Sequence, residues 1–133
     1  MPKVGRKERR VTMTERIAVL VVEDEPLRRI DVVDQLEQSR FEVFQAPNAD
    51  TAIKILETYP AIRVLFTDID MPGSMDGLKL AAAVRDRWPP IRIVITSGLR
   101  KIDIGALPQE ARFFPKPYNV SEVASTMRAM VQS

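Results

Sequence analysis

Polar side chains with chemical potential follow four of the apolar segments of this chain, each at the point where the segment ends. They are Glu23 and Asp24 after the first segment, Asp68 after the third, Thr96 after the fourth and Lys116 after the fifth. In an open parallel sheet, ligands bind beyond the carboxyl ends of the strands. If these segments are parallel strands, we expect the acids, the hydroxyl and the amine to converge on one edge of the sheet.

Such a group of residues suits phosphoryl chemistry assisted by a metal. Two carboxylates roughly 4 Å apart repel by about 4 kcal/mol at an effective dielectric near 20, so three of them need a cation. Oxygen ligands alone favour Mg²⁺, with Mn²⁺ possible. Lys116 supplies a second positive charge for a phosphate, and Thr96 can donate a hydrogen bond to it. Asp68 is then left as a nucleophile whose oxygen can attack phosphorus.

The composition excludes several other chemistries. The chain of 133 residues contains no cysteine and no histidine. Thiol catalysis, disulfides, zinc sites and Ser–His triads are therefore ruled out. A chain without histidine also cannot carry a phosphohistidine, so it is neither a histidine kinase core nor a histidine phosphotransfer domain. Apolar residues make up 45% of the sequence, enough for the core of one domain.

Short β-branched runs alternate with helical patterns along the chain. Continuous apolar runs of strand length indicate strands buried on both faces, which in turn require a parallel sheet covered by helices on both sides. The predicted strands are residues 17–22, 42–46, 64–67, 91–95 and 113–114, and residues 42–46 mix polar with apolar side chains, as expected for an edge strand. The predicted helices start near Pro26, Asn48, Asp76 and Asn119. Residues 97–111, which contain two glycines and Pro108, leave room only for a short or irregular fourth helix.

Apolar spacing predicts which side chains of the first two helices face the core. In the first helix the predicted inward residues are Ile30, Val33 and Leu36. In the second helix they are Ala52, Ile53, Leu56 and Tyr59.

The order of motifs resembles the receiver domain of two-component response regulators over residues 17–132. The resemblance rests on Asp24, on Asp68-Ile69-Asp70-Met71-Pro72-Gly73, on Thr96-Ser97-Gly98 and on Lys116-Pro117. It implies an α/β fold of the flavodoxin-like (βα)5 type, a doubly wound parallel sheet with strand order 2-1-3-4-5. It also implies phosphorylation of Asp68 by a histidine kinase or a histidine phosphotransfer protein.

The same resemblance implies roles for individual residues. Mg²⁺ would be held by Asp24, Asp68 and the backbone carbonyl of Asp70, with Glu23 assisting through water. Lys116 would bind the phosphoryl group and precede a cis Pro117, and Thr96 and Phe113 would form a switch pair. The acid pair is Glu-Asp here, where many relatives have Asp-Asp.

Residues 1–16 read as a flexible basic extension, with six basic and two acidic side chains and a net charge of +4. We expect residues 17–133 to form the receiver domain, with no output domain. The expected protein is a cytoplasmic, stand-alone regulator, a monomer or weak homodimer, that switches the binding of an unknown downstream protein. It lacks an apolar run of about 18 residues, so we expect no membrane association, and we expect no direct nucleic acid binding.

Two alternatives remain at this point. The chain could use the receiver fold as a binding module that is never phosphorylated. It could also be a phosphatase of the haloacid dehalogenase type, since Asp68-Ile69-Asp70 matches the Asp-x-Asp motif of those enzymes. Those enzymes place the motif after the first strand, whereas here it follows the third. We therefore favour a receiver, which acts on its own aspartate and is not an enzyme in the usual sense.

Overall fold

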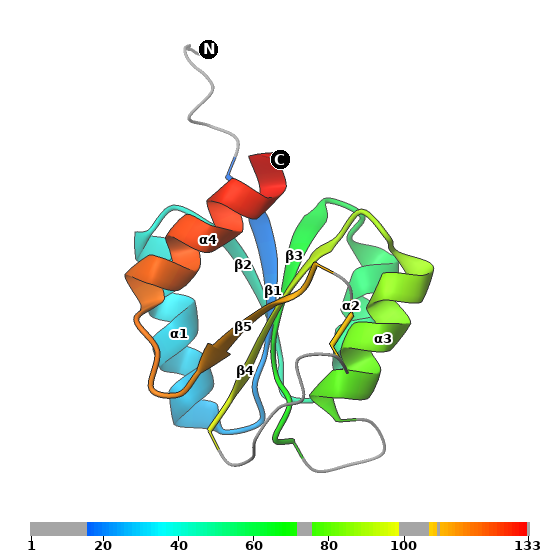
Figure 1. Cartoon of the computed structure of the whole chain (residues 1–133), viewed down its shortest axis with the longest axis horizontal. Helices are drawn as coiled ribbons and strands as arrows, with labels where there is room; N and C mark the ends of the chain where they lie inside the picture. The colour runs from blue at the N-terminus through cyan, green and yellow to red at the C-terminus, as the bar shows by residue number, and fades with distance from the viewer. Residues whose placement is uncertain (1–15, 72–75, 99–106, 109, 133) are drawn as a thin grey trace.

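The computed structural model describes residues 16–71, 76–98, 107–108 and 110–132. Its centre is a five-stranded parallel sheet in the order β2-β1-β3-β4-β5, as expected from the resemblance (Figure 1). The strands are β1 (Ala18–Val22), β2 (Glu42–Ala46), β3 (Ile62–Asp68), β4 (Arg92–Ser97) and β5 (Arg112–Pro115).

Helices cover both faces of this sheet. They are α1 (Pro26–Gln38), α2 (Ala49–Thr58), α3 (Gly77–Arg87) and α4 (Val120–Gln132). Figure 1 shows α1 and α4 on one face and α2 and α3 on the other. Most of the predicted short helix at 97–111 lies outside the described residues. None of the helices described is long and apolar enough to cross a membrane.

The sheet separates two apolar cores, because successive side chains of a strand point to opposite faces. In β1, Leu20 and Val22 pack with residues of α2 and α3, whereas Val19 and Val21 pack with residues of α1 and α4. All five residues of β1 are buried, which explains why the segment reads as a continuous apolar run.

Polar side chains cap the N-terminal ends of the helices, close to the starts that the sequence predicts. The side chains of Glu25, Asn48 and Asp76 accept hydrogen bonds from backbone N–H groups of the first turns of α1, α2 and α3. The Asn119 side chain likewise accepts a hydrogen bond from the Glu122 N–H at the start of α4, at 3.2 Å. These caps fix the helix ends that adjoin the carboxyl edge of the sheet.

Two predictions about inward residues were wrong. Ile30 is 57% exposed, because α1 buries Val32, Val33 and Leu36, and Ile30 lies about 120° from Leu36 around the helix. Tyr59 is 46% exposed because α2 ends at Thr58, so Tyr59 leaves the helical path. Its ring instead packs on Phe44, with ring centroids 4.8 Å apart.

Candidate functional site

The residues singled out at the strand ends meet at one edge of the sheet. From β1 the chain passes to β2 on one side of it and then to β3 on the other side. The direction in which strands are added to the sheet therefore reverses between β1 and β3. This is the topological switch point of a doubly wound sheet. Asp68 is the last residue of β3 and pairs in register with Thr96 of β4. Glu23 and Asp24 directly follow β1, and Lys116 directly follows β5.

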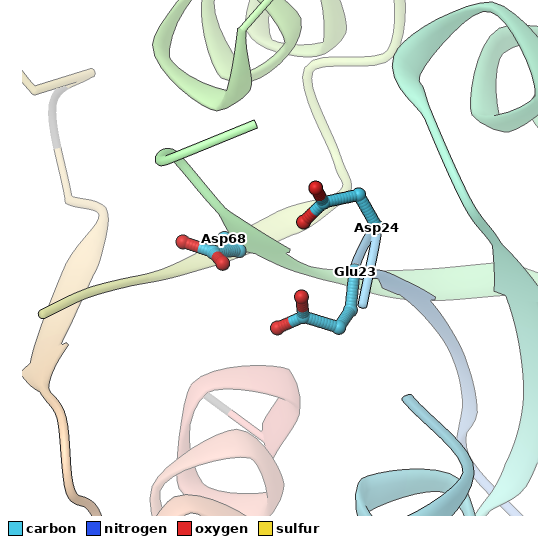
Figure 2. A group of neighbouring side chains, drawn as sticks. All are labelled: Glu23, Asp24 and Asp68. Carbon is cyan, nitrogen blue, oxygen red and sulfur yellow. The ribbon is translucent and has the colours of Figure 1, made fainter. Parts of the chain in front are cut away.

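Three carboxylates gather at this switch point. Glu23, Asp24 and Asp68 each offer an oxygen within 4.8 Å of the others. Figure 2 shows their carboxyl groups extending to the same side, Glu23 and Asp24 from the loop after β1 and Asp68 from the end of β3. Glu23 and Asp68 are only 5% and 4% exposed. This set of oxygen ligands could hold a hard metal ion, and the chain has no histidine or cysteine that could add a softer ligand.

Lys116 provides positive charge to the cluster. Its Nζ donates a hydrogen bond to Asp68 Oδ2 at 2.7 Å and lies 3.6 Å from Glu23 Oε1. The pKa of the Glu23 carboxyl is raised above its ordinary value, mainly by burial and further by the charge of Asp68. Two groups oppose that rise in pKa. They are the Glu25 N–H, which donates a hydrogen bond to Glu23 Oε2 at 3.0 Å, and the positive charge of Lys116. One amine therefore faces an excess of negative charge.

Backbone groups orient the carboxylate of Asp68. Its Oδ1 accepts a hydrogen bond from the Asp70 N–H at 2.9 Å. The Ile69 N–H donates to the Thr96 carbonyl oxygen at 3.0 Å, which ties the turn after β3 to β4. Both carboxylate oxygens of Asp68 thus have a defined partner.

The side chain of Asp70 has contacts that the sequence analysis did not predict. Its Oδ2 accepts hydrogen bonds from Ser97 Oγ at 2.8 Å and from the Gly98 N–H at 3.1 Å. The resemblance implied a role only for the backbone carbonyl of Asp70. The reason for the contacts is register, which only the structure gives: Asp68 pairs with Thr96, so the residues just beyond them on β3 and β4 are also neighbours.

Two glycines allow close approaches at the site, and the sequence analysis assigned no role to either. A Cβ added to Gly98 would lie 3.1 Å from Lys116 Cβ and 3.3 Å from its Cδ. The stem of Lys116 thus passes along the Gly98 backbone. A Cβ added to Gly77, the first residue of α3, would lie 2.2 Å from the carbonyl oxygen of Asp68. The start of α3 therefore sits directly against the backbone of Asp68.

Thr96 and Phe113 lie on neighbouring strands but are not direct partners. Thr96 is 2% exposed and pairs in register with Phe114, whereas Phe113 pairs with Ile95. Phe113 is partly buried and packs on the core beneath α2 and α3. Thr96 lines a small pocket of about 10 Å³ together with Asp68, Glu23 and Tyr118. That volume is about the size of one water molecule.

A larger groove opens beside the cluster, between α1 and the chain that follows β5. Its volume is about 720 Å³, and its walls include Val32 and Gln35 of α1 and Tyr118 and Val120 opposite. Lys116 lines this groove as well as contacting Asp68, so the groove adjoins the cluster. The peptide bond between Lys116 and Pro117 is cis, as the resemblance implied.

Comparison with known proteins identifies the family. Residues 19–128 match the response regulator receiver domain. A sensor kinase CckA of Brucella abortus is 28% identical over 98% of this chain and 14% of its own length. A putative response regulator NtrX-like of Rickettsia bellii is 34% identical over 77% of this chain and 22% of its own length. The chain thus spans less than a quarter of the length of either relative.

Solved structures show the same fold. A response regulator receiver domain protein from Clostridium thermocellum superposes with a TM-score of 0.81 at 22% identity, covering 87% of this chain and 94% of the other. The receiver domain from the hybrid histidine kinase CckA gives a TM-score of 0.73 at 27% identity, covering 86% and 99%. Receiver domains are signalling domains rather than classical enzymes, and this disfavours the phosphatase alternative. The chain belongs to the response regulator receiver domain family.

Proposed function

We propose that this chain accepts a phosphoryl group on Asp68 from the phosphohistidine of a histidine kinase or a histidine phosphotransfer protein. The observation that carries the proposal is the environment of Asp68. This carboxylate is nearly fully buried at the switch point, lies 2.7 Å from a lysine amine, and adjoins two further carboxylates. Structural ion pairs need no such excess of acid, whereas a site for a cation and a phosphoryl group does.

The transfer exchanges one bond to phosphorus for another. An oxygen of Asp68 forms a bond to phosphorus as the bond from phosphorus to the donor imidazole nitrogen breaks. In the unphosphorylated protein the Lys116 amine donates a hydrogen bond to Asp68 Oδ2. After the transfer it donates instead to a phosphoryl oxygen and stabilises the product. The Asp70 N–H holds the other oxygen of Asp68 in place throughout. The Thr96 hydroxyl, next to Asp68 in register, donates a hydrogen bond to a phosphoryl oxygen.

The residues present fit a bound Mg²⁺ ion, with Mn²⁺ as a substitute. Asp24, Asp68 and the backbone carbonyl of Asp70 would hold the ion, and Glu23 would assist through water. When bound, the cation neutralises charge on the phosphoryl oxygens and on the carboxylate cluster. The fit rests on the three carboxylate oxygens within 4.8 Å of one another and on the absence of histidine and cysteine from the chain.

The partner and the output follow from the same site. The groove between α1 and the chain after β5 reaches Lys116, so a donor protein that lies along α1 can bring its phosphohistidine to Asp68. Exposed Leu27 and Ile30 give α1 an apolar surface for that contact. The similarity to the sensor kinase CckA of Brucella abortus supports this class of partner. Movement of Thr96 toward the phosphate would shift Phe113 between two populations and change the binding of a downstream protein.

The test is intact-mass measurement after incubation with acetyl phosphate, with Mg²⁺ and with EDTA. We expect one phosphoryl adduct on the wild type with Mg²⁺ only, and none on Asp68→Asn. Asp86→Asn, which changes an exposed acid on α3, is the matched control and should behave as the wild type. A wild type that gains no adduct, from acetyl phosphate or from a histidine kinase, would instead be a phosphate-independent binding module. Continuous release of phosphate from many esters would indicate a phosphatase.

A further inference from the structure

Arg29 makes two contacts that connect α1 to the acidic loop and to the edge strand. Its Nη1 donates a hydrogen bond to the backbone carbonyl of Glu23 at 2.9 Å, and its Nε donates to Gln45 Oε1 of β2 at 3.1 Å. The neighbouring Arg28 is exposed and has no such bond among the described residues. The two arginines therefore share a turn of α1 but differ in what they contact.

The contact with Glu23 fixes a peptide that carries two acids of the cluster. The carbonyl of Glu23 belongs to the peptide that joins Glu23 to Asp24. The N–H of Glu23 donates to the Ala46 carbonyl at 3.1 Å, and its Oε2 accepts from the Glu25 N–H at 3.0 Å. With Arg29 on its carbonyl, Glu23 is held at its N–H, its side chain and its C=O.

We propose that Arg29 is a positioning residue for the cation site, acting through the Glu23–Asp24 peptide. The inference rests on the proposed function, since it assumes that the carboxylates of Glu23, Asp24 and Asp68 bind Mg²⁺. Mg²⁺ demands near-ideal geometry of its ligands, and groups that orient such ligands typically change metal affinity by about 10- to 100-fold when they are removed. A planar guanidinium with donors in a fixed fork suits this role, because it can hold the Glu23 carbonyl and Gln45 together.

Charge and positioning predict opposite effects at this residue. Arg29 is a cation beside a cation site, so by charge alone its removal would tighten Mg²⁺ binding. If Arg29 positions the acids, its removal weakens binding in spite of the lost repulsion. The sign of the change in Mg²⁺ affinity therefore separates the two roles. Replacement of a residue that only stabilised the fold would leave the Mg²⁺ affinity of the folded protein unchanged.

The experiment measures the dissociation constant of Mg²⁺ by titration of amide NMR signals, with folding followed by circular dichroism. The variants are Arg29→Met, Arg29→Lys, Gln45→Met and Arg28→Met. We expect Arg29→Met to weaken binding about tenfold and Gln45→Met to weaken it a few-fold, because one of the two anchors of Arg29 remains. Arg29→Lys should recover part of the loss, since an ammonium can still reach the Glu23 carbonyl. Arg28→Met removes the same charge one residue away and should bind Mg²⁺ as the wild type does, or more tightly.

Equal or tighter binding by Arg29→Met would overturn the inference and leave the proposed function intact. If Arg29→Met does not fold, unchanged affinity in Gln45→Met and Arg29→Lys would overturn it in the same way. A wild type that fails to bind Mg²⁺ at millimolar concentrations would remove the metal from the proposed function, and this inference with it.

Discussion

Replacement of Gly77 by alanine is a sharp test of how the fold positions the acceptor. The new Cβ would lie 2.2 Å from the Asp68 carbonyl oxygen, 2.5 Å from Ile69 Cα and 2.8 Å from the Asp68 carbonyl carbon. Non-bonded heavy atoms prefer to be roughly 3.5 Å or more apart, so the start of α3 and the end of β3 must separate by about 1 Å. All three obstructing atoms are backbone atoms, so no side-chain rotation can relieve the contact.

The expected cost follows from this overlap. Overpacking of this kind costs about 1–3 kcal/mol, and a rigid backbone neighbour places Gly77→Ala near the upper end. The higher helix propensity of alanine offsets at most about 1 kcal/mol. We therefore expect the free energy of unfolding to fall by about 2 kcal/mol. Since a misplacement of about 1 Å can cost on the order of 100-fold in rate, we also expect much slower phosphorylation of the molecules that remain folded.

Urea unfolding followed by circular dichroism gives the first quantity, and the rate of adduct formation from acetyl phosphate gives the second. Ala82→Gly is the matched control, because Ala82 is exposed in the same helix. It should lose about 1 kcal/mol through helix propensity and keep the normal phosphorylation rate. A Gly77→Ala protein that is as stable as the wild type, or that is phosphorylated at the normal rate, would refute the reasoning.

Two further predictions concern the charges of the cluster. Lys116→Met leaves buried carboxylates without their amine, so in EDTA the free energy of unfolding should fall by about 3 kcal/mol. Addition of Mg²⁺ should restore part of that loss. Urea unfolding of the variant in EDTA that matches the wild type would contradict this prediction. The pKa of Glu23 is raised in the folded protein, so the folded state binds the proton more tightly than the unfolded state does. Without metal, the wild type should therefore lose stability as the pH rises from the ordinary pKa of glutamate through the raised value, relative to Glu23→Gln. Unfolding curves of both proteins across that pH range check the prediction, and parallel pH profiles would show it to be wrong.

Much of the fold was accessible from the sequence because its signals are local. The strands β1, β3 and β4 are mostly buried runs rich in β-branched residues, and the helix starts carry Glu25, Asn48, Asp76 and Asn119 as caps. The strand order came from the resemblance and not from the pattern, since alternating strands and helices are compatible with several orders. The predictions for Ile30 and Tyr59 failed because spacing does not show where the buried arc of a helix lies or where the helix stops.

The clustering of the candidate site was predictable for a topological reason. Residues directly after parallel strands must share an edge of the sheet, so the acids, Thr96 and Lys116 could be grouped without coordinates. The contacts of Arg29, the side chain of Asp70 and the two glycines could not, because each depends on how two elements approach within a few ångströms. Such approaches are set by packing between helices and strands, and one sequence carries no local signal for them.

The hydrogen bonds around Asp68 have a mechanical consequence, because with the packing of Lys116 they form a closed circuit. From Asp68 the circuit runs to the Asp70 N–H, from the Asp70 carboxylate to Ser97 and Gly98, along the Gly98 backbone to the stem of Lys116, and from its amine back to Asp68. It passes through the ends of β3, β4 and β5 in turn. A circuit cannot lengthen at one link without strain at another. A group added to Asp68 that draws the Lys116 amine away would therefore displace the ends of β4 and β5, and so transmit a change in one bond to the surface that those strand ends support.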